Sequence, residues 1–210
     1  MFQTISWVSL GLVLAGIIGH CLLSPRQRLA KGKAAKAAKG NGRSWWCCCS
    51  GDLSTLAKLR RLACLLAAGS LVMLFVTGFA GRLLFGEQIT GYTLMLHVGL
   101  APVFIVCTGF ILVVWGYQCR LNEDDWQGLT SLMRLEKTDS GDTADLGWKL
   151  TFWLSMFLVV PVSLSMVLGM FQIFGTHGQE LLISLHQYTS LALTLVAMIH
   201  VHLIIRRQRK

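Results

Sequence analysis

The sequence predicts an all-α integral membrane protein with five membrane-spanning helices. Apolar residues make up 54% of the 210 residues, only three residues are proline, and the mean hydropathy is +0.59. The apolar residues form blocks long enough to cross a bilayer, which is typical of membrane helices and leaves little chain for a separate soluble domain. No long run alternates apolar and polar residues, as the strands of a membrane barrel would. The five blocks are Ile5–Leu23, Leu62–Phe85, Tyr92–Trp115, Leu150–Phe174 and Leu181–Ile205.

The distribution of charge predicts the orientation of these helices. Basic residues crowd the stretch from Arg26 to Arg61 and the C-terminal residues 206–210, whereas the short connections Gly86–Gly91 and Gly175–Gln179 contain no Lys or Arg. Because positively charged connections stay in the cytoplasm, we expect the N-terminus outside and the C-terminus inside. The formal charge of +9 then lies on the cytoplasmic face of the inner (cytoplasmic) membrane. Attraction to anionic lipid accounts for it, and no nucleic-acid partner is required.

The first apolar block is expected to be a retained helix, because no positive segment precedes it as in a signal peptide. The seven cysteines are all assigned to the membrane or the cytoplasmic side, where disulfides are not expected. The run Cys47–Cys49 lacks the ligand spacing of a zinc site, so no site is assigned there. The expected organisation is an N-terminal transmembrane helix (1–23), a basic cytoplasmic linker (24–60), a four-helix domain (61–205) and a basic tail (206–210).

The last apolar block contains two histidines, His186 and His200, fourteen residues apart. Fourteen residues are close to four helical turns, so the two side chains lie within about 40° on one helix face and roughly 21 Å apart along the axis. Imidazoles inside a membrane are costly unless they have partners, so a functional site is the default interpretation. This spacing predicts one ligand for each of two stacked haems.

A third histidine, His97, lies about six residues inside the outer end of its block, as His186 does in the last block. Both are therefore buried roughly 9 Å from the same membrane surface. Two imidazoles at equal depth on two helices predict a b-type haem held between them. The alternative is that each histidine is a buried polar residue bonded to a neighbouring carbonyl. His202 is rotated by about 200° from His200, so only His200 shares the face of His186.

Three sequence segments resemble a known family of membrane cytochromes. They are Ile183-Ser184-Leu185-His186 with Ile199-His200-Val201-His202, the pair Thr77-Gly78 ahead of His97, and Asp145-Leu146-Gly147-Trp148-Lys149 leading into Phe152-Trp153. Over about residues 55–205 the chain resembles the four-helix cytochrome b subunits of membrane-bound formate dehydrogenases and nickel–iron hydrogenases. The resemblance implies a haem-binding four-helix bundle whose last helix supplies one ligand to each of two b-type haems. It pairs His97 with His186 at the outer haem.

The inner haem departs from the pattern of that family. The resemblance places the partner of His200 about fourteen residues before Gly78, where this sequence has Cys64. A thiolate can bind haem iron, but an inert apolar cysteine is the commoner outcome. His20, in the additional N-terminal helix, lies at nearly the depth of His200. We therefore expect His20 to pair with His200, the alternative being an inner haem that is absent or five-coordinate.

Three further expectations concern the ends of the helices. Arg82, near the outer end of its helix, is expected to neutralise a propionate of the outer haem, with snorkelling to the lipid headgroups as the alternative. The acidic connection before the fourth block is expected to contain an amphipathic interfacial helix at Trp126–Leu135. In the last connection, Thr176 and Gln179 fit a capping box that would explain the segment around His177.

The favoured function is transmembrane electron transfer through b-type haem. The sequence has no soluble cofactor domain or nucleotide motif, so we expect an electron-transfer subunit of a larger oxidoreductase rather than a complete enzyme. Its expected partners are a redox subunit of the same complex and a quinone. The alternative is a membrane anchor without redox activity, in which the histidines are structural. A transporter with proton-relaying histidines is less favoured, because the spans contain almost no acidic residues.

Overall fold

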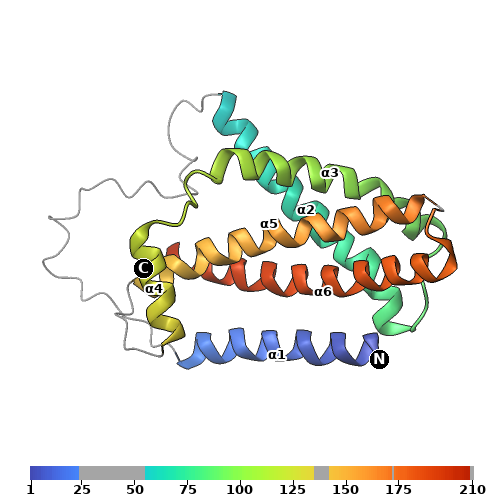
Figure 1. The fold of residues 1–210 in the computed structure, drawn as a ribbon, viewed down its shortest axis with the longest axis horizontal. Coiled ribbons are helices and arrows are strands. Elements are labelled where there is room, and N and C mark those ends of the chain that lie inside the picture. The colour runs from blue at the N-terminus through green and yellow to red at the C-terminus, as the bar shows by residue number, and fades with distance from the viewer. Residues whose placement is uncertain (24–54, 135–141, 172, 209–210) are drawn as a thin grey trace, which may run out of the picture.

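The computed structural model describes residues 1–23, 55–134, 142–171 and 173–208 (Figure 1). Five of the helices in this part are long and apolar enough to cross a membrane, and no strand is present in it. The prediction of an all-α membrane protein with five spans is therefore confirmed. The Cys47–Cys49 run and most of the basic linker lie outside the described residues. The helices are α1 (Phe2–Leu23), α2 (Thr55–Leu84), α3 (Gly91–Trp115), α4 (Glu123–Met133), α5 (Asp142–Met170) and α6 (Gly175–Gln208).

The long helices other than α1 form two antiparallel hairpins, α2 with α3 and α5 with α6. Within each hairpin the two helices pack along each other, whereas the contact between hairpins, mainly α3 with α5, is much smaller. The connection between α2 and α3 is short and turns at Gly86 and Gly91, whose φ angles are 73° and 60°. Such left-handed backbone is readily adopted by glycine. The helices of each hairpin are therefore in close contact along their length, whereas the two hairpins contact each other much less.

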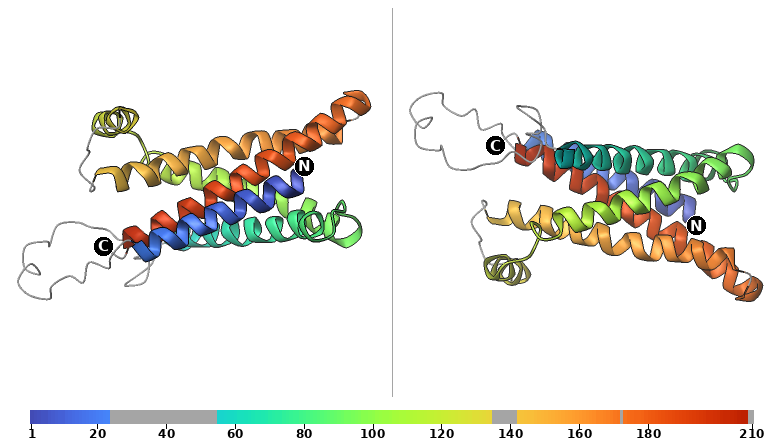
Figure 2. Two further views of the ribbon diagram at one scale, coloured as in Figure 1. Left: turned by 90° about the horizontal axis from the view of Figure 1, so that it is seen from below. Right: turned by 90° about the horizontal axis from the view of Figure 1, so that it is seen from above.

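Helix α1 bridges the two hairpins by packing against α6 and α2 (Figure 2). Its N-terminal end, called the outer end after the orientation expected from the charges, is anchored by the Nε2 of Gln3 and the Nε1 of Trp7, which both donate to the carbonyl of Leu83, at 2.8 and 3.3 Å. That carbonyl is among the last four of α2, which have no partner within their own helix. Farther along α1, Leu10 is buried in one cluster with Leu191 of α6. The N-terminal helix therefore contacts one helix of each hairpin.

The opposite end of the bundle, called the inner end in the same sense, contains a second apolar cluster. Trp115 at the end of α3 packs with Phe152 of α5, and Cys64 and Leu203 lie against them. The indole Nε1 of Trp153 donates to the carbonyl of Cys119 at 2.9 Å, which ties the segment after α3 to α5. This cluster joins the two hairpins at the inner end.

The predicted amphipathic helix at Trp126–Leu135 is present as α4, and it begins three residues earlier, at Glu123. The reason is the carboxylate of Asp125, which accepts the backbone N–H of Asn122 at 2.8 Å and orders the residues ahead of Trp126. The same carboxylate binds the Nζ of Lys149 of α5 at 2.5 Å. The N–H of Asn122 and then the ammonium of Lys149 hold the pKa of Asp125 below its usual value. This one acidic side chain joins α4 to α5.

We expect the docking of α4 on α5 to be stable at neutral pH and to be lost in acid. Because the pKa of Asp125 is lower in the folded state than in the unfolded state, its carboxylate stabilises the folded state at pH values above the unfolded pKa, about 3.9 for Asp. This stabilisation is lost as the pH falls through the pKa of the folded state. Asp125→Asn removes it at every pH. Losing a charged hydrogen bond of about 1.5 kcal/mol predicts about tenfold faster amide hydrogen exchange in residues 123–133. Exchange that already accelerates between pH 7 and pH 5 in the wild type, after correction for intrinsic rates, would contradict this account.

The start of α6 differs from the predicted capping box. The helix begins at Gly175, so Thr176 lies inside the first turn rather than ahead of it. The amide Nε2 of Gln179 donates to the carbonyl of Phe171 at 3.0 Å instead of folding back onto its own helix. The capping-box prediction is therefore wrong. The left-handed backbone of Gly175, with φ of 62°, begins the helix, and Gln179 satisfies a carbonyl at the end of α5.

Candidate functional site

The structure brings His97 and His186 together from the two hairpins. His97 lies on α3 and His186 on α6, and both side chains are half-buried. Their ring centroids are 6.3 Å apart and their planes are at 79° to each other. The equal depth of these two histidines on neighbouring helices, predicted from the sequence, thus corresponds to a direct encounter in space.

The hydrogen bond of His97 determines which of its nitrogens carries the proton. Its Nδ1 lies 2.9 Å from the Oγ1 of Thr77 on α2. The Thr77 hydroxyl donates its own proton to the carbonyl of Met73, at 2.7 Å, one turn earlier in α2. A hydroxyl has one proton to give, so it must accept from His97. While Thr77 donates to Met73, His97 carries its proton on Nδ1, which leaves the lone pair of Nε2 available.

His186 and His200 have the same protonation pattern. The Nδ1 of His186 donates to the carbonyl of Val162 on α5 at 3.0 Å, since a carbonyl can only accept. The Nδ1 of His200 lies 2.8 Å from the Oγ1 of Thr151, whose proton goes to a carbonyl of its own helix. A histidine that binds a metal through Nε2 almost always donates its other N–H in this way.

Gly78 gives the ring of His97 room against α2. A Cβ atom built at this glycine would lie 3.0 Å from the Cε1 of His97 and 3.5 Å from its Nδ1. The first distance is shorter than ordinary van der Waals contact, so a side chain here would push the ring away. Thr77 and Gly78 together form a cradle in which the hydroxyl binds the ring and the missing side chain admits it. The cradle belongs to the pair of residues that the sequence resemblance singled out.

Gly78→Ala is expected to displace His97 and weaken any ligand held by its Nε2. Overpacking of this kind costs about 1–3 kcal/mol, which corresponds to at least about fivefold weaker retention of the ligand. Gly69→Ala is the matched control, because it lies on the same helix and a Cβ there meets nothing within 4 Å. The check is the haem content of the two purified variants. Equal haem content would show that the contact between Gly78 and His97 is unimportant.

The separation of the two imidazoles would suit a haem held between His97 and His186. Nitrogen–metal bonds are about 2 Å long, so two imidazoles on opposite sides of one ion have centroids roughly 6 Å apart, close to the 6.3 Å observed. Among the described residues no group of three or more His, Cys, Asp or Glu is placed to hold an ion with protein ligands alone. A haem iron needs only two axial ligands from the protein. The donors present thus fit a haem better than a bare metal ion.

His20 lies against His202 and not against His200. The Nδ1 of His20 is 3.0 Å from the Nε2 of His202, and the ring centroids are 5.3 Å apart. Arg206 also donates to the ring of His20. His200 faces α5 through Thr151, whereas α1 packs on the opposite face of α6. The expected pairing of His20 with His200 is therefore wrong. The reason is that His200 and His202 lie on different faces of α6, and α1 packs on the face that carries His202.

The surroundings of His200 differ from those of the outer pair. The ring of Phe152 lies 6.4 Å from the ring of His200 between centroids. Phe152 belongs to the inner apolar cluster, and Cys64 is half-buried against the same cluster. The structure therefore keeps Cys64 in the neighbourhood of the inner site but gives His200 no facing imidazole among the described residues.

Arg82 lies near the outer pair. It is half-buried at the outer end of α2 and stands four residues, about one helical turn, after Gly78, so the two share a face of α2. Among the described residues no acidic side chain forms an ion pair with it. Its role toward a propionate stays a prediction.

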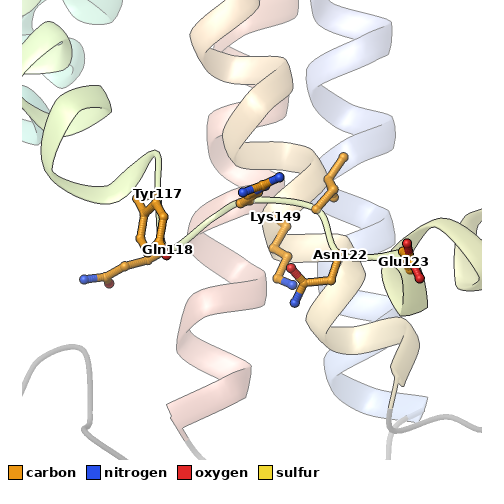
Figure 3. A pocket seen from close by; sticks show the side chains of 7 residues that line it. Tyr117, Gln118, Asn122, Glu123 and Lys149 are labelled. Carbon is orange, nitrogen blue, oxygen red and sulfur yellow. The ribbon is translucent and has the colours of Figure 1, made fainter.

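A pocket of about 390 Å³ opens between the segment that follows α3 and the start of α5, at the inner end of the bundle (Figure 3). Lys149, on its wall, is two residues before Thr151, the hydrogen-bond partner of His200. Sequence reasoning did not find this pocket, because its wall comes from two distant segments. The residues that line it are Tyr117, Gln118, Arg120, Leu121, Asn122, Glu123 and Lys149.

Comparisons with protein families, with curated proteins and with solved structures give no match for this chain.

Proposed function

We propose that this chain transfers electrons across a membrane through b-type haem, as the membrane subunit of a larger, quinone-linked oxidoreductase. The observation that carries the proposal is the encounter of His97 and His186, each with Nδ1 hydrogen-bonded and with ring centroids 6.3 Å apart. A bound haem would supply a one-electron iron couple. The chain itself supplies the two nitrogen ligands, their orientation and an apolar surrounding.

A purely structural role accounts less well for the outer pair. Neither Nε2 of His97 and His186 has a hydrogen-bond partner among the described residues. Inside a membrane an imidazole nitrogen without a partner is costly. Binding one metal ion between the two Nε2 atoms removes that cost. The hydrogen bonds of both Nδ1 atoms prepare the rings for this ligation.

His200 is proposed as a ligand of a second haem at the inner end. It has the same protonation pattern as the outer ligands, and the inner cluster around Phe152 supplies an apolar wall. Because His20 is bonded to His202, the iron of this haem would have either Cys64 as its second protein ligand or no second protein ligand at all. Arg82 is the proposed counter-charge for a propionate of the outer haem.

The inner pocket supports a link to quinone. Gln118 and Asn122 supply amide donors that suit quinone carbonyls, and Glu123 and Lys149 are ionisable groups on the same wall (Figure 3). The pocket adjoins the part of α5 that binds His200. We further propose a redox subunit as electron partner, anionic lipid at the basic face, and the inner (cytoplasmic) membrane as location, with the C-terminus inside.

The second candidate function is a membrane anchor without redox activity. Its support is that every one of the three histidines has a local hydrogen-bond partner, as structural histidines do. The two functions differ in one property, because an anchor does not move electrons.

Sealed vesicles containing the purified protein test the proposal. Ferricyanide is trapped inside, and a reductant that does not cross lipid is added outside. We expect the trapped ferricyanide to be reduced at least about tenfold faster than in protein-free vesicles, and His186→Leu to remove the difference. If wild-type vesicles containing stoichiometric folded protein behave like protein-free vesicles, the electron-transfer function is wrong and the anchor is favoured.

A further inference from the structure

The three candidate ligands differ in what accepts the proton of their Nδ1. For His186 the acceptor is the backbone carbonyl of Val162, whereas the Nδ1 of His200 is bonded to the side-chain hydroxyl of Thr151, at 2.8 Å. For His97 the partner is the side-chain hydroxyl of Thr77, at 2.9 Å. Among the described residues no backbone carbonyl accepts a hydrogen bond from the Nδ1 of His97. The outer pair therefore combines one ligand held by backbone with one held by a side chain.

We propose that Thr77 is the positioning residue for His97. Its hydroxyl sets the tautomer and the ring orientation of His97 and thereby lowers the reduction potential of the outer site. This inference rests on the proposed function, since a potential exists only if haem binds there. It does not concern the electron partner or the quinone.

The hydroxyl of Thr77 is held as an acceptor by its place in α2. Thr77 is 7% exposed, and its Oγ1 gives its proton to the carbonyl of Met73 at 2.7 Å. Threonine in a helix has few χ1 rotamers, and bonding to the carbonyl one turn back favours one of them. The lone pairs of Oγ1 are thus aimed away from the helix, toward His97. Gly78 admits the ring next to them.

Removing this hydroxyl has two consequences for His97. The proton is no longer held on Nδ1, so the other tautomer, which protonates Nε2 and cannot bind a metal, becomes populated. In the tautomer that still binds, the ring loses the hydrogen bond that makes its Nε2 a stronger donor. A weaker donor favours the reduced iron, so the potential rises. Loss of such partners typically weakens metal binding about 10–100-fold.

The test compares Thr77→Val, which keeps the shape and loses the hydroxyl, with Thr77→Ser, which keeps the hydroxyl. Thr108→Val is the matched control, because Thr108 is also 7% exposed and donates to its own helix at Phe104, at 2.6 Å, without touching a histidine. Ser165→Ala is the contrast at the other ligand, since His186 keeps the carbonyl of Val162. The readouts are the midpoint potential of the outer haem and its retention on the purified protein.

A second readout uses protein purified from a host that makes no haem. Nitrogen-15 NMR of the histidine rings, with the His97 signals assigned from His97→Gln, reports which ring nitrogen carries the proton. We expect Nδ1–H for His97 in the wild type and in Thr77→Ser, and a mixture of tautomers in Thr77→Val. This measurement is independent of the redox function.

The expected outcome is a raised potential and at least about tenfold weaker haem retention in Thr77→Val, with Thr77→Ser, Thr108→Val and Ser165→Ala near the wild type. If wild-type protein binds haem and Thr77→Val keeps both its potential and its tautomer, the role of Thr77 is wrong and the proposed function stands. If wild-type protein binds no haem, the proposed function fails, and the NMR result still decides whether Thr77 sets the tautomer of His97.

Discussion

Replacing His97 or His186 by leucine is expected to abolish haem binding at the outer site. In the proposed site each side chain supplies one of the two nitrogen ligands, and their ring centroids lie 6.3 Å apart. Leucine fills a similar volume but offers no lone pair, so affinity at this site should fall by at least about 100-fold, more than for loss of a supporting hydrogen bond. The measurement is the haem content and the reduced visible spectrum of each purified variant.

The two substitutions are expected to have the same effect, because the two ligands act as a unit. His177→Leu is the control, since His177 is exposed in the first turn of α6 and lies away from the pair. Its haem content should equal that of the wild type. A variant lacking His97 or His186 that retains the full haem content and spectrum would show that the pair is structural.

Replacing His200 by leucine is the second substitution with a large expected effect. We expect it to remove the inner haem and to leave the outer one, because the two histidines of α6 are roughly 21 Å apart along the helix. The total haem content should therefore fall by about half relative to a protein that binds two. Redox titration of the variant should show the outer component alone.

His20→Leu separates this account from the pairing expected from sequence. His20 contacts His202 and Arg206, so its replacement should leave the inner haem in place. Cys64→Ala, measured alongside, tests whether the thiol is the sixth ligand. Loss of the inner haem in His20→Leu, with the outer haem retained, would contradict this account. It would mean that His20 lies next to His200 in the membrane and not next to His202.

Much of the fold could be predicted from the sequence, because a bilayer imposes simple demands. Each span needs about 20 apolar residues, and the chain shows five such blocks. The encounter of His97 with His186 was also predictable, since equal depth on adjacent antiparallel pairs leaves few other partners. The helices extend past the apolar blocks, as α2 does to Thr55, because helical hydrogen bonding does not stop where the lipid core ends.

The partners of the histidines could not be predicted in the same way. The face of α6 that α1 covers depends on packing around Leu10 and Leu191, and apolar residues on all sides of a membrane helix give no preferred face. His20 was therefore placed at the right depth beside the wrong histidine of α6. The acceptors of Nδ1, such as Val162, are backbone atoms or common hydroxyls that carry no signal in sequence.

The role of α1 also became visible only in three dimensions. From the sequence, it is expected only to be an additional helix that supplies His20 as a ligand. In the structure it is tied to α2 through Gln3 and Trp7 and to α6 through His20. Helix α1 therefore contacts both hairpins, which otherwise contact each other little.

The most direct test of the central claim is the haem stoichiometry of the purified wild-type protein, measured by the pyridine haemochrome method together with a reduced-minus-oxidised spectrum. The account predicts non-covalently bound b-type haem with a low-spin spectrum, at one or two per chain, whose outer component is lost in His97→Leu. Folded, monodisperse protein from a haem-sufficient host that carries no haem would contradict it.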